Sequence, residues 1–207
     1  MPTDMKRGRF LVIEGGDGVG KTTQVAAVAE ALTAAGTKVR TTREPGGTEL
    51  GEQLRALLVS DREIDPAAEA LILLAARAQH CAEVIGPALE RGEWVLSDRF
   101  EGSFYAYQGY GRGIALSDLE ALNDFAVGGV RPDLTILLTS GASGGYRELD
   151  GSDRFEGMGE DFRSRVEAGY LALAERHGWE VVNGRGSREE VTERILAVVR
   201  RRLGLKA

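Results

Sequence analysis

Short apolar runs alternate with longer amphipathic stretches along the whole chain. The short runs predict strands at 10–13, 38–42, 93–97, 134–138 and 179–182. The longer stretches predict helices at 23–32, 48–58, 67–91, 117–127, 162–177 and 188–203. This regular alternation is typical of an α/β fold in which helices cover both faces of a parallel sheet. We therefore expect one α/β domain over residues 1–207, built on a five-stranded parallel sheet.

Two helix boundaries depend on particular residues. Pro87 falls inside the stretch 67–91, where it should kink or divide the helix. Ser117 and Glu120 have the spacing of a capping box, which would start the helix there.

A glycine-rich segment follows the first predicted strand. Gly15–Thr22 matches the phosphate-loop pattern G-x-x-x-x-G-K-[ST] in full, with a strand before it and a helix after it. Glycines let backbone N–H groups turn toward phosphate oxygens, and the following helix adds a favourable dipole. We expect a nucleoside triphosphate to bind to Gly15, Gly16, Asp17, Gly18, Val19, Gly20, Lys21, Thr22 and Thr23. In this arrangement Lys21 reaches the β and γ phosphates, and the Thr22 hydroxyl holds Mg²⁺.

Charged residues follow three successive strands. Arg43 comes after the second strand, Asp98 and Arg99 after the third, and further arginines after the fourth. One arginine of this kind could be a surface ion pair, but ligands bind at the carboxyl ends of parallel strands. We therefore expect Arg43 and Arg99 to bind substrate, and Asp98 to join Thr22 in holding Mg²⁺. The glycine-rich segment at about 140–157 is interpreted as a mobile lid.

Composition narrows the class of protein. The net charge of −6 argues against a nucleic-acid-coating protein, and no apolar run approaches the length of a membrane span. Cys81 is the single cysteine, which excludes an internal disulfide and fits a reducing compartment. We expect a soluble, cytoplasmic protein with no nucleic-acid or membrane partner.

Several segments together resemble bacterial thymidylate kinases. They are FLVIEGGDGVGKTTQ (10–24), TREPGGT (42–48), AARAQH (75–80), SDRF (97–100), AYQG (106–109), GRG (111–113) and DRFE (153–156). The resemblance covers nearly the whole chain in order. It implies a P-loop kinase fold with a short lid, transfer of phosphate from ATP to dTMP with Mg²⁺ to give dTDP, and a homodimer.

The resemblance also implies roles for individual residues. Arg77 matches an arginine that contacts the thymine ring, and Gln108 matches a second base contact. Tyr107 matches a tyrosine beside the 2′ carbon of the sugar, which would favour deoxyribose. Arg99 matches the arginine that holds the acceptor phosphate, and Asp17 matches an acidic residue near the acceptor's sugar and phosphate.

The family supplies a catalytic arginine from the phosphate loop or from the lid. The loop position is Gly18 here, so we assign the lid type, with Arg154 as the first candidate and Arg147 as the second. The expected catalytic set is Lys21, Arg99, Arg154, Asp17 and Arg147.

The chain departs from the family pattern around the base. Leu73 stands where a stacking aromatic residue is expected, and Phe104 stands where a small polar residue is usual. Phe104 could supply the missing ring face or serve in packing. Pro45 is a candidate for a cis peptide bond, although trans is the commoner form of any X–Pro bond.

Two other functions stay open from the sequence. One is a different deoxynucleotide kinase or a deoxynucleoside kinase, which would need a carboxylate base to activate a sugar hydroxyl. The other is a non-catalytic ATP-binding switch on the same fold.

Overall fold

The five predicted strands form one parallel sheet. The computed structural model describes residues 7–60, 62–140 and 158–204. The strand order is β2-β3-β1-β4-β5, and every neighbouring pair is parallel, as expected. The strands are β1 (Phe10–Glu14), β2 (Val39–Arg43), β3 (Trp94–Asp98), β4 (Leu134–Thr139) and β5 (Glu180–Asn183).

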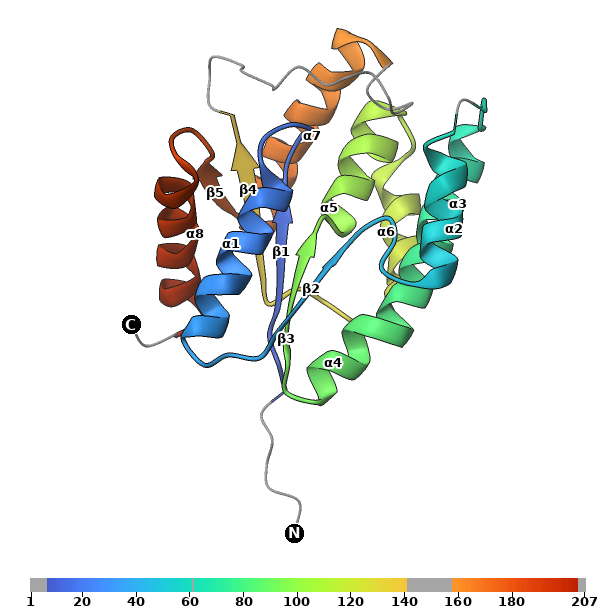
Figure 1. The fold of residues 1–207 in the computed structure, drawn as a ribbon. Helices are drawn as coiled ribbons and strands as arrows, with labels where there is room; N and C mark the ends of the chain where they lie inside the picture. Colours follow the sequence, from blue (N-terminus) through green and yellow to red (C-terminus); the bar gives the residue numbers. More distant parts are fainter. Residues whose placement is uncertain (1–6, 61, 141–157, 205–207) are drawn as a thin grey trace.

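Helices cover both faces of this sheet (Figure 1). The α-helices are α1 (Lys21–Ala34), α2 (Glu49–Leu58), α3 (Pro66–His80), α4 (Gly86–Glu90), α5 (Glu101–Phe104), α6 (Leu116–Val127), α7 (Glu160–His177) and α8 (Arg188–Leu203). Two π-helical segments, η1 (Cys81–Ile85) and η2 (Tyr105–Gly111), continue α3 and α5.

Alternate side chains of the central strand β1 point to opposite faces of the sheet, and each set packs into a different hydrophobic core. Leu11 and Ile13 of β1 pack against α1 and α8. Phe10 and Val12 point to the opposite face and pack with residues of η1, α4 and α6. A third cluster joins α3, η2, α6 and α7. All five residues of β1 are buried, as expected for the central strand of a sheet covered on both faces.

The helix expected at 67–91 is divided, as its proline predicted. α3 ends at His80, η1 spans the next five residues, and Pro87 lies in the first turn of α4. Proline has no N–H, and its ring crowds the carbonyl group four residues earlier. The wider π-helical turn before Pro87 accommodates both effects.

Two local expectations differ from the structure. α6 begins at Leu116, and its N-cap residue Ala115 makes no side-chain cap, so the capping box of Ser117 and Glu120 is wrong. Residues 101–111, which show no helical pattern in the sequence, are helical as α5 and η2. The glycines and aromatic residues of this segment show no helical spacing of apolar positions. Packing against α7 stabilises the helix instead.

Two glycines allow α7 to approach η2 closely. A Cβ atom on Gly169 of α7 would lie 2.6 Å from the Tyr110 ring, and one on Gly111 would lie 2.6 Å from the Phe162 ring. Neither distance is compatible with normal packing. The absence of these two methyl groups therefore sets the spacing between the two elements.

We expect Gly169→Ala to destabilise the protein by about 1–3 kcal/mol because of overpacking against Tyr110. In an open helix interior the same change stabilises by about 0.5–1 kcal/mol, so the sign of the effect is diagnostic. Urea unfolding measures the change. The control is Ala168→Ser at the exposed neighbouring position, which should stay within about 0.5 kcal/mol of the parent. An unfolding midpoint of Gly169→Ala at or above that of the parent would contradict the packing argument.

Candidate active site

The carboxyl ends of three adjacent strands meet at one edge of the sheet. β3 lies between β1 and β2, and its last residue, Asp98, is in register with Ile13 on one side and Arg43 on the other. The segments that follow these strands therefore share one edge (Figure 1). They carry the phosphate loop, Arg99, which the sequence predicted at a strand end, and Glu44.

The phosphate loop holds its lysine in a buried position. Gly15, Gly18 and Gly20 adopt positive φ angles of 146°, 76° and 95°, so the loop's path is one that glycine favours. The Lys21 ammonium group donates to the carbonyl of Gly16 at 2.6 Å. Burial, with a smaller contribution from the nearby Arg99 charge, lowers the pKa of Lys21 to about 7.

Thr22 and Asp98 lie together beside this lysine. The Thr22 hydroxyl donates to Oδ2 of Asp98 at 2.6 Å. Both side chains offer the hard oxygen donors that Mg²⁺ prefers when most of its ligands are phosphate oxygens and water. Within the described ranges, no group of three or more His, Cys, Asp or Glu residues could hold a metal by itself. The residues present therefore fit a nucleotide-bound Mg²⁺ rather than an all-protein metal site.

Arg99 lies at the centre of the site. Its backbone has φ 71°, in the left-handed region that non-glycine residues seldom adopt. Its Nη1 donates to the Gly15 carbonyl at 3.0 Å, to the Ser103 hydroxyl at 3.0 Å and to the Tyr170 hydroxyl at 2.9 Å. Its Nη2 forms an ion pair with Asp17. These contacts fix the guanidinium between the phosphate loop, α5 and α7.

Asp17 connects the phosphate loop to η2. The Tyr107 hydroxyl donates to Oδ2 of Asp17 at 2.5 Å, while Arg99 contacts Oδ1. Burial by itself would raise the pKa of the Asp17 carboxyl, but the charges of Arg99 and Lys21 outweigh it and hold the pKa below its usual value. Asp17 is therefore an ionised carboxylate shared by two predicted substrate residues.

A second carboxyl group, that of Glu14, is connected to Arg99 through Ser103. Its Oε1 accepts from the backbone N–H of Phe100 at 2.9 Å, and its Oε2 accepts from the Ser103 hydroxyl at 2.6 Å. Burial raises the pKa of Glu14 above its usual value. These two hydrogen bonds hold the start of α5, and they place the Ser103 hydroxyl within hydrogen-bond distance of Arg99.

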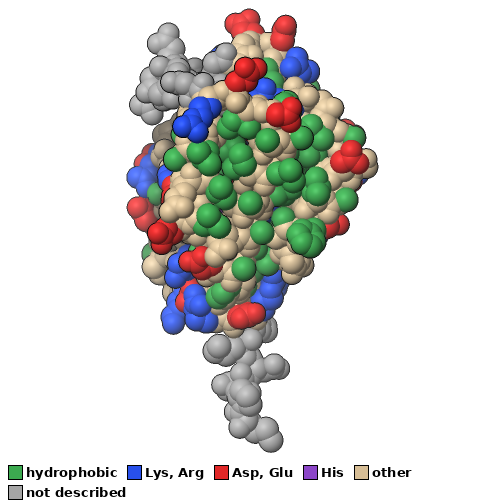
Figure 2. Space-filling view, turned by 90° about the vertical axis from the view of Figure 1, so that its right-hand side faces the viewer, with side chains coloured by type: hydrophobic (Ala, Val, Ile, Leu, Met, Phe, Trp, Pro, Cys, Tyr) green, Lys and Arg blue, Asp and Glu red, His purple; other side chains and the backbone are tan. Residues whose placement is uncertain are grey.

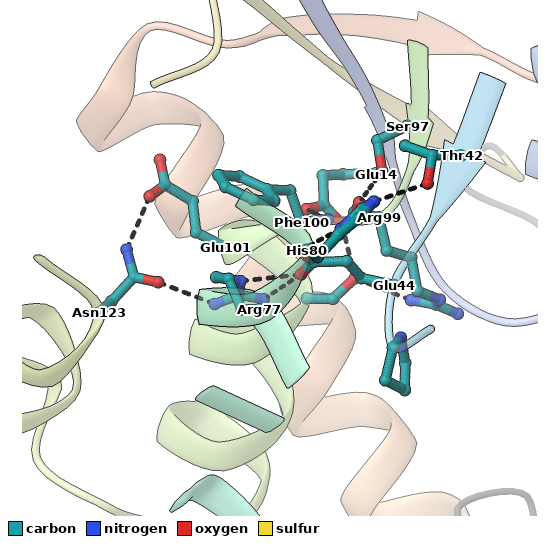
Figure 3. Close-up of polar contacts among 12 residues, drawn as sticks. Glu14, Thr42, Glu44, Arg77, His80, Ser97, Arg99, Phe100, Glu101 and Asn123 are labelled. Atoms are coloured by element: carbon teal, nitrogen blue, oxygen red, sulfur yellow. Dashed lines mark hydrogen bonds and ion pairs between the residues drawn. The ribbon is translucent and has the colours of Figure 1, made fainter. Parts of the chain in front are cut away.

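Arg77 is buried within a hydrogen-bonded network (Figure 3). Its Nε donates to Oε2 of Glu44 at 2.8 Å, and its Nη1 donates to Oδ1 of Asn123 at 2.8 Å. Burial by itself would raise the pKa of Glu44, but Arg77 and His80 outweigh it and lower that pKa. His80 joins Oε1 of Glu44 to the Thr42 hydroxyl, at 3.0 and 2.6 Å.

A cavity of about 120 Å³ opens beside Arg77. Since one water molecule needs about 10–15 Å³ of cavity volume, the cavity has room for a ring-sized group. Its lining includes most of the predicted acceptor residues: Asp17, Leu73, Arg77, Arg99, Phe104, Tyr107 and Gln108. The Arg77 guanidinium lies 4.9 Å from the centre of the Phe100 ring and 5.3 Å from that of Phe104. Phe104 thus packs on the arginine and also faces the cavity.

Gln108 is oriented by a buried carboxylate. Its Nε2 donates to Oε1 of Glu69 at 3.0 Å, and Glu69 also pairs with Arg112 at 2.7 Å. The Oε1 atom of Gln108 is buried and has no hydrogen-bond partner among the described residues. Gln108 lines the cavity, and an N–H donor that reached this oxygen would satisfy it.

Some predicted site residues lie outside this cavity. Arg43 is exposed, pairs with Glu52 at 2.9 Å and borders the neighbouring groove at the phosphate loop. Arg147 and Arg154, with nearly all of the expected lid at 140–157, lie outside the described residues. The Glu44–Pro45 peptide bond is cis, so the commoner trans form does not apply here.

Sequence reasoning did not assign roles to several residues of the site. They are Glu14, Glu44, Glu69, His80, Ser103, Asn123 and Tyr170. Glu44 had a signal, because it follows Arg43 at a strand end. Ser103 contacts Arg99 four positions earlier, but the other hydrogen bonds of these residues within the site join positions that are 22 to 89 apart along the chain, so no local pattern marks them.

Comparisons with known proteins agree with this geometry. The family model described as thymidylate kinase matches residues 13–195. A thymidylate kinase of Methylococcus capsulatus is 49% identical over 173 residues, covering 82% of this chain and 83% of the relative. One of a Synechococcus strain is 44% identical over 198 residues, covering 95% and 96%. No described helix has the length and apolar character needed to cross a membrane.

Among solved structures, the crystal structure of thymidylate kinase from Ehrlichia chaffeensis superimposes with a TM-score of 0.78 at 32% identity. The match covers 93% of this chain and 99% of the other. It confirms the P-loop kinase fold that the sequence resemblance implied. With a family model over most of its length and relatives close to half identical, this chain belongs to the thymidylate kinase family.

Proposed function

We propose that this enzyme transfers the γ-phosphoryl group of ATP to dTMP, giving ADP and dTDP. The observation that carries the proposal is a pair of adjoining compartments at one sheet edge. A groove borders the phosphate loop, the cavity borders Arg77, and both Asp17 and Arg99 line the two spaces. A donor in the groove and an acceptor in the cavity would meet at Arg99, as in-line transfer requires. We place the enzyme in the cytoplasm, because its single cysteine, Cys81, is a free thiol of the kind kept in reducing compartments.

On the donor side, the phosphate loop would bind the triphosphate of ATP. Lys21 would contact the β and γ phosphates, with Thr22 and Asp98 holding Mg²⁺. The metal would neutralise charge on the phosphates. Arg154, and after it Arg147, would add positive charge to the transferring group from the segment after β4, because the loop offers only Gly18 at the alternative position.

On the acceptor side, Arg99 would hold the monophosphate and Tyr107 would lie beside the sugar. Arg77 and Gln108 would contact the base, with N–H donors from the arginine and the unpaired Oε1 of the glutamine. A thymine ring presents both an acceptor carbonyl and an N–H donor on one edge, which complements this pair. Leu73 and Phe104 would form the apolar walls.

The reaction itself needs little from the side chains beyond position and charge. An oxygen of the acceptor phosphate attacks the γ phosphorus, and the bond from that phosphorus to the β-phosphate oxygen breaks. The acceptor oxygen is already ionised, so no side-chain base is required. This separates the proposal from a deoxynucleoside kinase, which must deprotonate a sugar hydroxyl.

A direct test compares acceptors in an assay of ADP release. We expect ADP formation with dTMP and Mg-ATP, and at least about tenfold lower kcat/KM with dCMP and thymidine, since each lacks a group that the site contacts. ATP alone is the control for hydrolysis. ATP binding without dTMP-dependent ADP release would instead support a nucleotide-binding switch, and a preference for thymidine would support a nucleoside kinase.

The buried lysine predicts proton uptake when ATP binds. With a pKa of about 7 in the free enzyme, Lys21 is mostly neutral at about pH 8, and the triphosphate charge should raise its pKa. We expect uptake of close to one proton per ATP at about pH 8, falling toward zero at about pH 6, where Lys21 is already charged. Calorimetric titration in buffers of different ionisation enthalpy measures this. Lys21→Arg, which stays charged, is the matched control, and a wild-type enzyme without uptake at about pH 8 would contradict the prediction.

We infer that the enzyme is a homodimer, as the family resemblance implied. Hydrophobic side chains gather across the side of the molecule that carries α2, α3 and α6 (Figure 2). The large exposed apolar residues of these helices are Leu50, Leu57, Leu71, Leu122 and Phe125. Phe125 is 89% exposed, which is unusual for a phenylalanine. A continuous apolar face of this kind is typical of a protein interface.

Phe125→Asp should shift the protein from dimer to monomer, because a carboxylate would be desolvated in an apolar interface. Light scattering coupled to size-exclusion chromatography gives the mass directly. The control is Val181→Asp, which adds the same charge at an exposed position of β5, at the far edge of the sheet from β2. Dimers of unchanged stability in Phe125→Asp would exclude this face as the interface.

A further inference from the structure

The pair formed by Arg77 and Glu44 has an unusual geometry. Nε and Nη2 of Arg77 both contact the same carboxylate oxygen, Oε2, at 2.8 and 2.7 Å. A guanidinium more often meets a carboxylate as a fork, with one N–H on each oxygen. Here the second oxygen, Oε1, is 3.0 Å from Nδ1 of His80 (Figure 3). His80 therefore takes the oxygen that a fork would give to Arg77.

The hydrogen-bonding state of His80 follows from its partners. Glu44 is ionised and can only accept, so Nδ1 of His80 must carry a proton. On the other side of the ring, Nε2 lies 2.6 Å from the Thr42 hydroxyl, which can donate or accept. His80 is fully buried and does not line the cavity, whereas Arg77 and Glu44 do. The His80 side chain would therefore act on a ligand in the cavity through Glu44 and Arg77 rather than by direct contact.

Arg77 is held from its other side as well. Nη1 donates to Asn123, whose amide in turn donates to Glu101 at 2.8 Å. Each of the two terminal nitrogens has two N–H groups, so each keeps at least one beyond these contacts. Their direction relative to the cavity depends on how Glu44 meets the guanidinium.

We propose that His80 is a positioning residue for recognition of the base. By holding Oε1 of Glu44, it keeps the Arg77 pair on a single oxygen and directs the remaining N–H groups of Arg77 to the acceptor's ring. Without the donor from His80, the carboxylate turns to a fork and draws the guanidinium round with it. This inference rests on the proposed function, because it assigns the base of dTMP to the cavity beside Arg77.

Two amide substitutions separate the two sides of the imidazole ring. In His80→Asn the amide nitrogen can replace Nδ1 and still donate to Glu44. In His80→Gln it can replace Nε2 and reach Thr42 instead. Both variants remove the ring, so both carry a comparable packing cost, which thermal unfolding measures.

We expect His80→Gln to raise the KM for dTMP by about tenfold, the usual effect of losing a hydrogen bond to a buried charge. His80→Asn should stay within about threefold of the wild type. The KM for ATP should be unchanged in both, since the hydrogen bonds of His80 to described residues go to Thr42 and Glu44 rather than to the phosphate loop. Equal KM values for dTMP in the two variants would overturn the proposal. A wild-type enzyme inactive on dTMP would instead overturn the proposed function.

A measurement on the wild-type protein tests the same point without a variant. The chain has two histidines, so the ¹⁵N resonances of the two rings can be assigned with one substitution at His177. We expect the Nδ1 of His80 to carry a proton at neutral pH. A ring protonated on Nε2 alone would leave Glu44 without its donor and would overturn the proposal even if His80→Gln failed to fold.

Discussion

The neutralisation of buried arginine charge is the constraint on which the site depends. Arg77 is almost fully buried and Arg99 is partly buried, and a guanidinium keeps its charge at any accessible pH. Each therefore needs a carboxylate: Glu44 follows β2, and Asp17 lies in the loop after β1. Removing either carboxylate would leave an uncompensated charge in a poorly solvated place, which costs far more than an exposed ion pair contributes. One pair joins α3 to the end of β2, and the other joins the phosphate loop to the end of β3.

The same charges prepare the site for phosphate. Asp17 pairs with Nη2 of Arg99, and three neutral oxygens share the two N–H groups of Nη1, so the guanidinium is already oriented before any ligand arrives. Such preorganisation reduces the ordering cost of binding. Lys21 has a depressed pKa because its ammonium group is buried and lies near the charge of Arg99. A polyanion would restore its charge, so binding of nucleotide and protonation of the lysine are coupled.

The proposed phosphate-binding and base-binding parts of the site differ in how they are built. The phosphate loop relies on backbone conformation, with glycines at positive φ and N–H groups at the start of α1. The part proposed to bind the base relies on side chains from α3, η2 and α6, each held by another side chain. Leu73 and Phe104 line the cavity with apolar surface, whereas the polar groups of Arg77, Glu44, His80 and Asn123 are joined to one another by hydrogen bonds.

Sequence alone determined the α/β class, the five strands, the phosphate loop and the charged residues at strand ends. These features follow from local rules: the period of apolar residues, the conformational freedom of glycine, and the position of ligands at carboxyl strand ends. The resemblance of its motifs added the family and most of the residues around the cavity.

Tertiary structure decided what lies behind those residues. Helix 101–111 forms because α7 packs on it, although its glycines and aromatic residues carry no helical pattern. His80 and Asn123 meet Arg77 or Glu44 across 36 and 46 positions of the chain. Whether a buried histidine or asparagine supports a binding residue depends on which donor faces which acceptor. Folding alone sets that relation, because hydrogen bonds are directional and the partners are distant in sequence.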